Sequence, residues 1–166
     1  TEQLLERVAV AVNGRTELTL DGKHISFKVP FRRLSMADAI REKTGYEMTG
    51  QMEEQVCEAG KRLNVETDAT MGKGKLIDAI FGQYCEEELI QPTFVCDYPR
   101  DMSPLCKRHR SNPDLTERFE LFVNGKELCN AYSELNDPID QLERFQEQLR
   151  LSEKGDDEVM FIDMDF

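Results

Sequence analysis

Apolar residues near the start of the chain recur first at helical and then at strand spacing. Over residues 2–12 they lie three or four positions apart, which predicts an amphipathic helix. Over 17–20 and 24–29 they alternate with polar residues on either side of Asp21-Gly22. An Asp-Gly pair between alternating runs is typical of a two-residue hairpin turn. The pattern therefore predicts a helix followed by an antiparallel hairpin.

Three helical patterns follow the hairpin. Ser35 and Asp38 have the spacing of a helix cap, and the helix that they start is expected to end near Gly45. Apolar residues at helical spacing then predict a helix around residues 51–63 and another over 75–89.

Strand signals dominate the next part of the chain. Residues 91–98 are rich in strand formers and bounded by prolines, which predicts a strand. The polar, proline-bearing stretch 99–118 lacks periodicity and is expected to be a long functional or mobile loop. Residues 118–123 and 126–135 flank Asn124-Gly125, which predicts a second hairpin.

A last helix begins at Asp137 and Pro138, an N-cap residue followed by a residue favoured at the first helical position. Its expected end lies near Lys154-Gly155. A further apolar pattern over 156–166 stops without a helix-ending signal, so we expect the chain to be part of a longer polypeptide. Together the elements predict an α+β fold, an antiparallel sheet with flanking helices.

Composition narrows the possible functions. The length of 166 residues suits one domain, and the hydrophobic content of 39% argues against disorder and against a membrane protein. A net charge of -12 disfavours DNA or RNA binding by these residues as a whole, because affinity for phosphates comes from Lys and Arg. The one basic run, residues 107–110, is either a solvated loop or a phosphate contact.

Acidic side chains within the second predicted hairpin are candidates for chemistry, because Asp and Glu are depleted in strands. Glu120, Glu127 and Glu134 are such residues. With a two-residue turn, Phe122 would face Glu127 and Glu120 would face Cys129, so Glu120 and Glu127 would share one face. Two such carboxylates suit magnesium bound to substrate phosphates. A solvent-facing strand with scattered acids is the alternative, and spacing alone does not decide between them.

The residues around these acids resemble class II lysyl-tRNA synthetases. The longest similar segment is RFELFVNGKELCNAYSELNDP, residues 118–138. Shorter ones are IQPTF at 90–94, DYP at 97–99, MSPL at 102–105, Arg144-Phe145 and Asp156-Asp157-Glu158. The resemblance runs from about residue 73 to the end, with a looser match at residues 30–36.

The resemblance implies a role for each residue of this hairpin. Glu120 and Glu127 would bind Mg²⁺ on the ATP phosphates. Asn130 would contact lysine and the nucleotide, and Tyr132 and Glu134 would line the pocket for the lysine side chain. Glu134 would set specificity, because a carboxylate facing an ammonium group rejects neutral side chains. No residue of the chain is expected to be catalytic in the sense of a covalent nucleophile.

A single shared pocket requires a change of register. Strict alternation from Glu127 would place Asn130, Tyr132 and Glu134 on the opposite face of the sheet. We therefore predict a β-bulge near Leu128-Cys129.

The resemblance also implies the activity of a parent protein: a cytoplasmic homodimer that joins lysine to ATP and then to tRNA, by positioning and charge neutralisation. Residues 1–166 would be part of the catalytic domain, between two arginine-bearing ATP motifs expected before Thr1 and after Phe166, and inactive alone. Two alternatives remain open: a stand-alone paralogue acting as a non-catalytic binding module, or a lysyl transferase with a protein acceptor.

Overall fold

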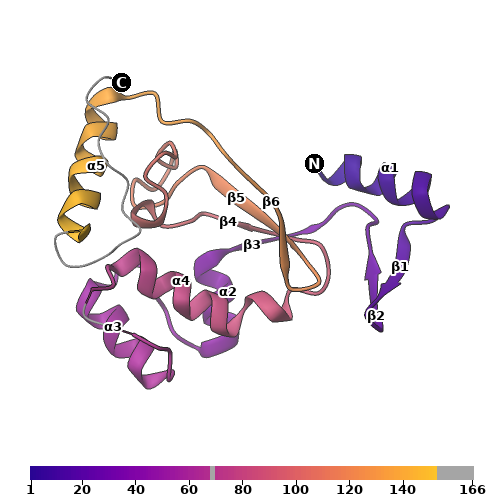
Figure 1. The fold of residues 1–166 in the computed structure, drawn as a ribbon, viewed down its shortest axis with the longest axis horizontal. Coiled ribbons are helices and arrows are strands. Elements are labelled where there is room, and N and C mark those ends of the chain that lie inside the picture. Colours follow the sequence, from indigo (N-terminus) through magenta and orange to yellow (C-terminus); the bar gives the residue numbers. More distant parts are fainter. Residues whose placement is uncertain (68–69, 153–166) are drawn as a thin grey trace.

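The computed structural model describes residues 1–67 and 70–152 and has an α+β architecture (Figure 1). The helices are α1 (Glu2–Asn13), α2 (Met36–Thr44), α3 (Glu53–Arg62), α4 (Lys73–Tyr84), α5 (Pro138–Ser152) and the 3₁₀ turns η1 (Glu86–Glu88) and η2 (Arg100–Met102). The strands are β1 (Glu17–Leu20), β2 (Lys23–Ser26), β3 (Arg32–Ser35), β4 (Thr93–Cys96), β5 (Arg118–Val123) and β6 (Lys126–Tyr132). The predicted fold class is confirmed. The expected helix end near Lys154-Gly155 and the pattern over 156–166 lie outside the described residues.

The main sheet contains four strands in the order β3-β4-β5-β6. β4, β5 and β6 are antiparallel neighbours, of which only the pairing of β5 with β6 was predicted, whereas β3 runs parallel to β4. Helices α2, α3 and α4 lie in the connection between β3 and β4, and a parallel pair needs such a crossover. β3, whose four residues include two arginines, was not predicted from the sequence.

The two faces of this sheet pack against different parts of the chain. Helices α2, α3 and α4 cover one face (Figure 1). The largest side chains fully buried in this core are Met36, Ile40, Val56, Leu76, Ile77, Ile80, Phe81, Val95, Tyr98 and Phe122. On the other face, Phe31, Phe94 and Leu121 form a smaller cluster. Because successive strand residues point to opposite faces, Phe94 and Val95 belong to different cores.

Residues 1–27, α1 with the β1–β2 hairpin, form an N-terminal arm beside the main body (Figure 1). Two carboxylates of α1 fasten the arm to the segment that leads into β3. Glu6 accepts a hydrogen bond from the Val29 amide at 3.1 Å. Glu2 accepts one from the Phe31 amide at 2.9 Å and pairs with Arg33 at 2.8 Å. The arm is thus held by polar contacts at its base, to which Leu5 and Phe27 add apolar packing against the cluster that contains Phe31.

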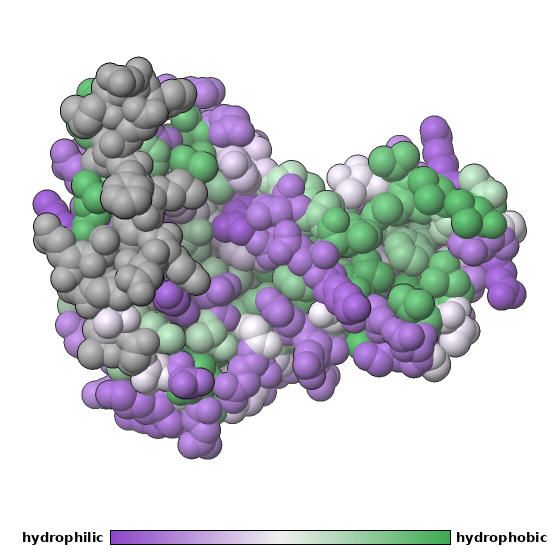
Figure 2. All heavy atoms as spheres, in the orientation of Figure 1, coloured by the Kyte–Doolittle hydropathy of each residue, from purple (hydrophilic) through white to green (hydrophobic). Residues whose placement is uncertain are grey.

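One side of α1 carries an apolar stripe. Leu4, Val8 and Val12 recur every four residues, with 64%, 47% and 74% of their surfaces exposed. Figure 2 shows apolar side chains gathered over the arm. Among residues 1–67 and 70–152, no helix has both the length and the apolar character needed to cross a bilayer.

Both predicted hairpins are confirmed, and both use left-handed turn residues. Asp21 and Gly22 have φ values of 50° and 77° between β1 and β2. Asn124 and Gly125 have φ values of 56° and 71° between β5 and β6. Two successive positive φ angles are what a type I′ turn requires, and they explain why these dipeptides identify the turns.

The ends of α2 also follow the sequence prediction. The Ser35 hydroxyl oxygen accepts a hydrogen bond from the Asp38 amide at 3.0 Å, which caps the free N-terminal amide. The helix ends at Gly45, whose φ of 72° places it in the left-handed region. The helices predicted over 2–12, 51–63 and 75–89 are present as α1, α3 and α4.

The long segment 99–118 is irregular, as predicted, and is joined to its surroundings at several points. Its isolated backbone bridges are Pro99 to Leu115, Arg108 to Thr116 and Cys106 to Glu134. Arg144 of α5 is buried and donates hydrogen bonds to the carbonyls of Ser103 at 3.0 Å and Cys106 at 2.8 Å. These contacts bind α5 and the segment to each other.

Candidate functional site

The β5–β6 hairpin contains the predicted bulge. Phe122 pairs with Glu127 and Leu121 pairs with Cys129, so Leu128 is an extra residue in β6. The register shift confirms the prediction made for this position. It also corrects one pair: Glu120 lies opposite Asn130 rather than Cys129, because the extra residue displaces every later partner by one.

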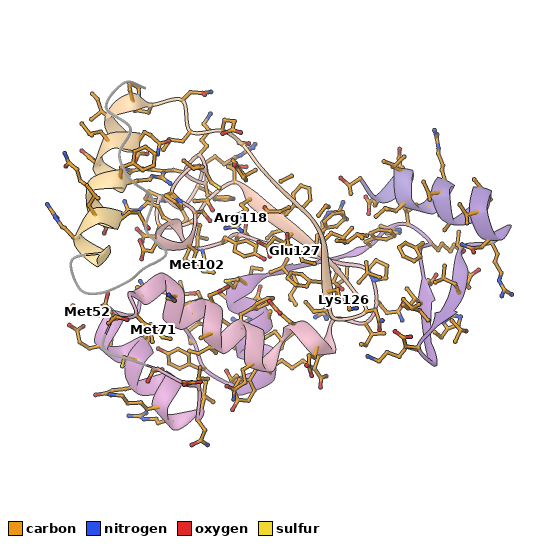
Figure 3. All side chains as sticks on the ribbon, in the orientation of Figure 1. Met52, Met71, Met102, Arg118, Lys126 and Glu127 are labelled. Atoms are coloured by element: carbon orange, nitrogen blue, oxygen red, sulfur yellow. The ribbon has the colours of Figure 1, made fainter. Side chains whose placement is uncertain are left out.

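The bulge brings four of the five predicted site residues to one face. In β5, Arg118, Glu120 and Phe122 alternate along the strand and point the same way. Their partners in β6 are Tyr132, Asn130 and Glu127, respectively, and antiparallel partners share a face. Phe122 packs in the helix-side core, so this is the face toward α4. Figure 3 shows Glu127 between Arg118, at the start of β5, and Lys126, at the turn end of β6.

Exposure increases from β5 to β6 across this face. Glu120 is buried, with 8% of its surface exposed, whereas Tyr132 is 39% exposed and Glu127 and Asn130 are exposed. The site therefore has a fixed carboxylate at its base and accessible polar groups along its outer strand. Such a gradient suits a surface that contacts a polar ligand from one side.

Both carboxylate oxygens of Glu120 accept hydrogen bonds from protein groups. The Tyr98 hydroxyl donates to Oε2 at 2.8 Å, and the Arg118 guanidinium donates to Oε1 and forms an ion pair. Burial, and next the Glu120 charge, raise the pKa of Tyr98, so the phenol remains a donor. The orientation of the Glu120 carboxylate is thus fixed by two neighbours.

Glu127 is electrostatically coupled to Glu120. Although Glu127 is exposed as a residue, partial burial of its carboxyl and then the Glu120 charge raise its pKa, and Arg118 opposes this shift. The pKa of Glu86, in η1, is raised by burial and then by Asp78, Glu120 and Glu127. Acidic groups from four elements, α4, η1, β5 and β6, therefore repel one another on this side of the sheet.

The donor chemistry of Glu120 and Glu127 fits magnesium. Mg²⁺ takes hard oxygen ligands and commonly binds through one or two carboxylates together with substrate phosphates. The repulsion that raises the pKa of Glu127 is what a divalent cation would relieve. Within the described part of the chain, no group of three or more His, Cys, Asp or Glu side chains could enclose a metal. A cation here would thus depend on ligands besides these two carboxylates.

Glu134 lies apart from the other four predicted residues. It follows β6, is exposed, and borders an open cleft of about 570 Å³ with Lys107, Arg108 and Asp140. Asn130 and Tyr132 are not among the residues that line this cleft. A pocket that joins Glu134 to them stays a prediction.

The basic run at 107–110 is largely engaged in ion pairs. Arg108 pairs with Asp140 at 2.7 Å, and Arg110 pairs with Glu117 at 2.9 Å. These contacts favour the interpretation of the run as a structured surface loop, while contact with phosphate stays untested.

Sequence reasoning missed Tyr98 and Arg118 as parts of the site. Both lie in segments on which the family resemblance rests, but their roles depend on a contact between β4 and β5. Arg118 precedes Glu120 by two residues in a predicted strand. Because alternate residues of a strand share a face, this spacing is the signal that could have identified Arg118 as part of the site. The Tyr98 contact spans 22 positions and has no local signature.

A second cleft, of about 430 Å³, lies near the start of α4 and is lined by none of the predicted site residues. Its charged lining residues are Asp38, Arg41, Glu47, Lys73, Asp97, Arg100, Asp101 and Asp114. Arg41 is paired with Asp38 and with Glu47. The mixture of signs identifies no ligand.

Comparison with known proteins points to one family. The family model of tRNA synthetases class II (D, K and N) matches residues 1–165. Similar relatives include the lysine–tRNA ligases of Christiangramia forsetii, 66% identical, and Porphyromonas gingivalis strain W83, 61% identical, each aligned with the whole chain and 29% of the relative. The lysine–tRNA ligase of Azobacteroides pseudotrichonymphae is 58% identical, with 33% of its length covered. The chain thus spans about a third or less of these relatives.

Proposed function

Because this chain belongs to the tRNA synthetases class II (D, K and N), we propose that it forms one wall of the ATP and lysine site of a lysine–tRNA ligase. The observation that supports this proposal most directly is the bulge at Leu128. It puts Glu120, Glu127 and Asn130 on one face in spite of their uneven spacing.

The ATP side of the proposed site is formed by the two glutamates. Glu120 and Glu127 bind magnesium together with the ATP phosphates, and Asn130 lies beside them to contact the nucleotide. The bound cation supplies charge neutralisation on the phosphates. Besides burial, repulsion from Glu120 raises the pKa of Glu127 against the opposing charge of Arg118. A bound cation would relieve this repulsion, which supports the assignment.

The lysine side of the proposed site lies along β6 and beyond it. Asn130 and Tyr132 contact the amino acid, and Glu134 pairs with the ammonium group of its side chain. Exposure of these residues supports a role in ligand contact. A carboxylate facing an ammonium group favours lysine over aspartate and asparagine, because those side chains leave the carboxylate unpaired.

The remaining parts of the reaction are assigned to residues outside this chain. The chain covers 29% to 33% of its relatives, so we propose that the rest of the polypeptide supplies two ATP-binding arginines, the tRNA contacts and the surface of a cytoplasmic homodimer. The 166 residues would then lack synthetase activity by themselves.

Lysine-dependent exchange of pyrophosphate into ATP by the complete protein tests this function. The wild type is expected to show exchange with lysine but not with aspartate or asparagine. Glu134→Gln should lower kcat/KM for lysine by about 100-fold or more, because the charged partner of the ammonium is lost. Glu147→Gln, at an exposed position of α5, is the control and should retain activity. Exchange that depends on another amino acid, or full activity of Glu134→Gln, would contradict the proposal.

A further inference from the structure

Arg118, at the start of β5, contacts two residues of the proposed site but is not itself among the residues assigned to ATP or lysine. Its Nη2 donates to the Glu120 carboxylate, and its Nε donates to Asn130 Oδ1 at 3.3 Å. The guanidinium carbon lies 4.5 Å from the centre of the Tyr98 ring, in a cation–π contact. One side chain therefore touches both the carboxylate of the ATP side and the amide of the lysine side.

The far edge of the guanidinium is anchored to the segment after β4. Nη1 donates to Ser103 Oγ at 2.9 Å and to the Met102 carbonyl at 3.2 Å, and Figure 3 shows Met102 close to Arg118. All three guanidinium nitrogens of Arg118 are thus engaged. The side chain is 16% exposed, so its position is set by these partners rather than by solvent.

The contact with Asn130 determines which way its amide faces. Because Oδ1 accepts from Arg118, the amide NH₂ group of Asn130 is left to donate elsewhere. A donor at this place suits a carboxylate, carbonyl or phosphate oxygen of a ligand. Without Arg118 the amide could rotate and present its oxygen instead, which would repel the same groups.

The contact with Glu120 has a second effect. Tyr98 and Arg118 each donate a hydrogen bond to one oxygen of this carboxylate and so fix the orientation of its plane. Each oxygen keeps a further lone pair that can bind a cation. A carboxylate already held in one orientation loses little rotational freedom on binding. Magnesium binding should therefore be weaker when the guanidinium is removed.

We propose that Arg118 is a positioning residue that orients Glu120 for the metal side and Asn130 for the amino-acid side of one site, with Tyr98 as its support. This inference rests on the proposed function. The geometry requires arginine, because the three nitrogens of its planar fork reach Glu120, Asn130 and Ser103 in fixed directions, whereas lysine keeps the charge but donates from a single nitrogen. A purely structural role, fastening residues 102–103 to the sheet, is the alternative.

The test uses Arg118→Lys in the complete protein, with Arg110→Lys as the matched control. Arg110 likewise donates to a glutamate, Glu117, in this case through both Nε and Nη2, but its side chain is exposed and it is not among the residues assigned to ATP or lysine. Arg118→Lys is expected to lower kcat for lysine-dependent exchange by about 10- to 100-fold. It should raise the Mg²⁺ concentration for half-maximal exchange about tenfold. Arg110→Lys should change neither quantity.

A measurement of nucleotide binding complements the exchange assay. Calorimetry with β,γ-methylene ATP, with and without Mg²⁺, measures how much the cation strengthens binding when no reaction occurs. Arg118→Lys should reduce that gain about tenfold. Tyr98→Phe, which keeps the ring and removes one hydrogen bond to Glu120, should reduce it by a smaller factor.

The outcomes separate the two proposals. If the wild type shows no lysine-dependent exchange, the proposed function fails and this inference fails with it. If the wild type is active and Arg118→Lys leaves the Mg²⁺ dependence and the calorimetric gain unchanged, only the positioning role is overturned, even when the variant melts at a lower temperature.

Discussion

Glu86 is placed where its negative charge is unfavourable. Burial comes first among the causes that raise its pKa, followed by the charges of Asp78, Glu120 and Glu127. A carboxyl with a raised pKa binds its proton more tightly in the folded state, so the stability linked to that proton is present at low pH and is lost as the pH rises through the raised pKa.

We therefore expect Glu86→Gln to stabilise the protein at neutral pH. The gain should be ~0.3–0.5 kcal/mol, the size of a like-charge contact on a protein surface. It should disappear below about pH 4, where the glutamate is protonated in both states. Urea unfolding at pH 7 and pH 4 measures the difference, and Glu87→Gln, at the exposed neighbouring position, is the control. Equal effects of the two substitutions at both pH values would contradict the expectation.

Asp140, in contrast to Glu86, lies where its negative charge is favourable. It accepts hydrogen bonds from Arg108, at 2.7 and 2.8 Å, and from Arg144, at 3.0 and 3.1 Å. Arg108 first and then Arg144 hold the pKa of Asp140 well below its usual range. A lowered pKa contributes stability above the unfolded value near 4, and this stability is lost as the pH falls.

Asp140→Asn should accordingly destabilise the protein by about 3 kcal/mol at pH 7, because the buried Arg144 loses its charge partner. The difference from the wild type should shrink as the pH falls below about 4. Chemical unfolding followed by circular dichroism gives both values. Glu143→Gln, at an exposed position of the same helix, should be nearly neutral. A loss that does not depend on pH would show that packing, rather than charge, dominates.

At the scale of elements, the turn of the β5–β6 hairpin is fixed to the segment that follows η1. The amides of Asn124 and Gly125 donate to the carbonyls of Ile90 and Leu89 at 3.0 and 3.1 Å. A Cβ at Gly125 would lie 3.1 Å from Glu87 Cα, whereas one at Gly22, in the other hairpin, would meet nothing within 4 Å. Both glycines have positive φ, so they differ chiefly in their surroundings.

Gly125→Ala should therefore cost more stability than Gly22→Ala. Each substitution carries the left-handed penalty of ~1–2 kcal/mol. Gly125→Ala should cost roughly 1 kcal/mol more, because the hairpin must move away from η1. Unfolding by guanidinium measures both. If the two variants were equally stable, the contact between the turn and η1 would have no energetic importance.

Local sequence signals predicted most elements but not the contacts between them. Asp21-Gly22 and Asn124-Gly125 identified both hairpins, and the spacing of Ser35 and Asp38 identified the start of α2. These signals work because turns and caps depend on a few adjacent residues. The parallel position of β3 and the hydrogen bond from Tyr98 to Glu120 depend on distant segments, so they became visible only in the structure.

The bulge at Leu128 is an instructive case of prediction. Strand periodicity alone put Glu120 opposite Cys129, which is wrong. The bulge itself was inferred from chemistry, since the resemblance required Asn130 and Tyr132 on the same side as Glu127. The local sequence of β6 contains no glycine at the bulge and gave no direct signal for it.

At the scale of the whole molecule, the N-terminal arm is held by the contacts of Glu2 and Glu6. Replacing Glu2 by Ala removes its hydrogen bond from the Phe31 amide and its ion pair with Arg33. We expect several-fold faster amide hydrogen exchange in α1, while exchange in α4 stays unchanged, because the arm shares little core with the body. Exchange followed by mass spectrometry checks this.

The substitution Gln3→Ala, at an exposed position of the same helix, is the matched control for the arm. It should leave exchange in α1 close to that of the wild type. Faster exchange in α4 as well as in α1 after Glu2→Ala would show that arm and body unfold as one unit.

Because β6 contains an extra residue, the effect of a deletion in this strand depends on whether one or two residues are lost. Removing one residue between Glu127 and Asn130 would leave them two positions apart, so a regular strand without the bulge would keep Asn130 and Tyr132 on the same side of the sheet as Glu127. Removing two would make them neighbours, and regular alternation would then transfer Asn130 and Tyr132 to the far side. Natural or engineered variants of this hairpin should therefore tolerate the loss of one residue here better than the loss of two.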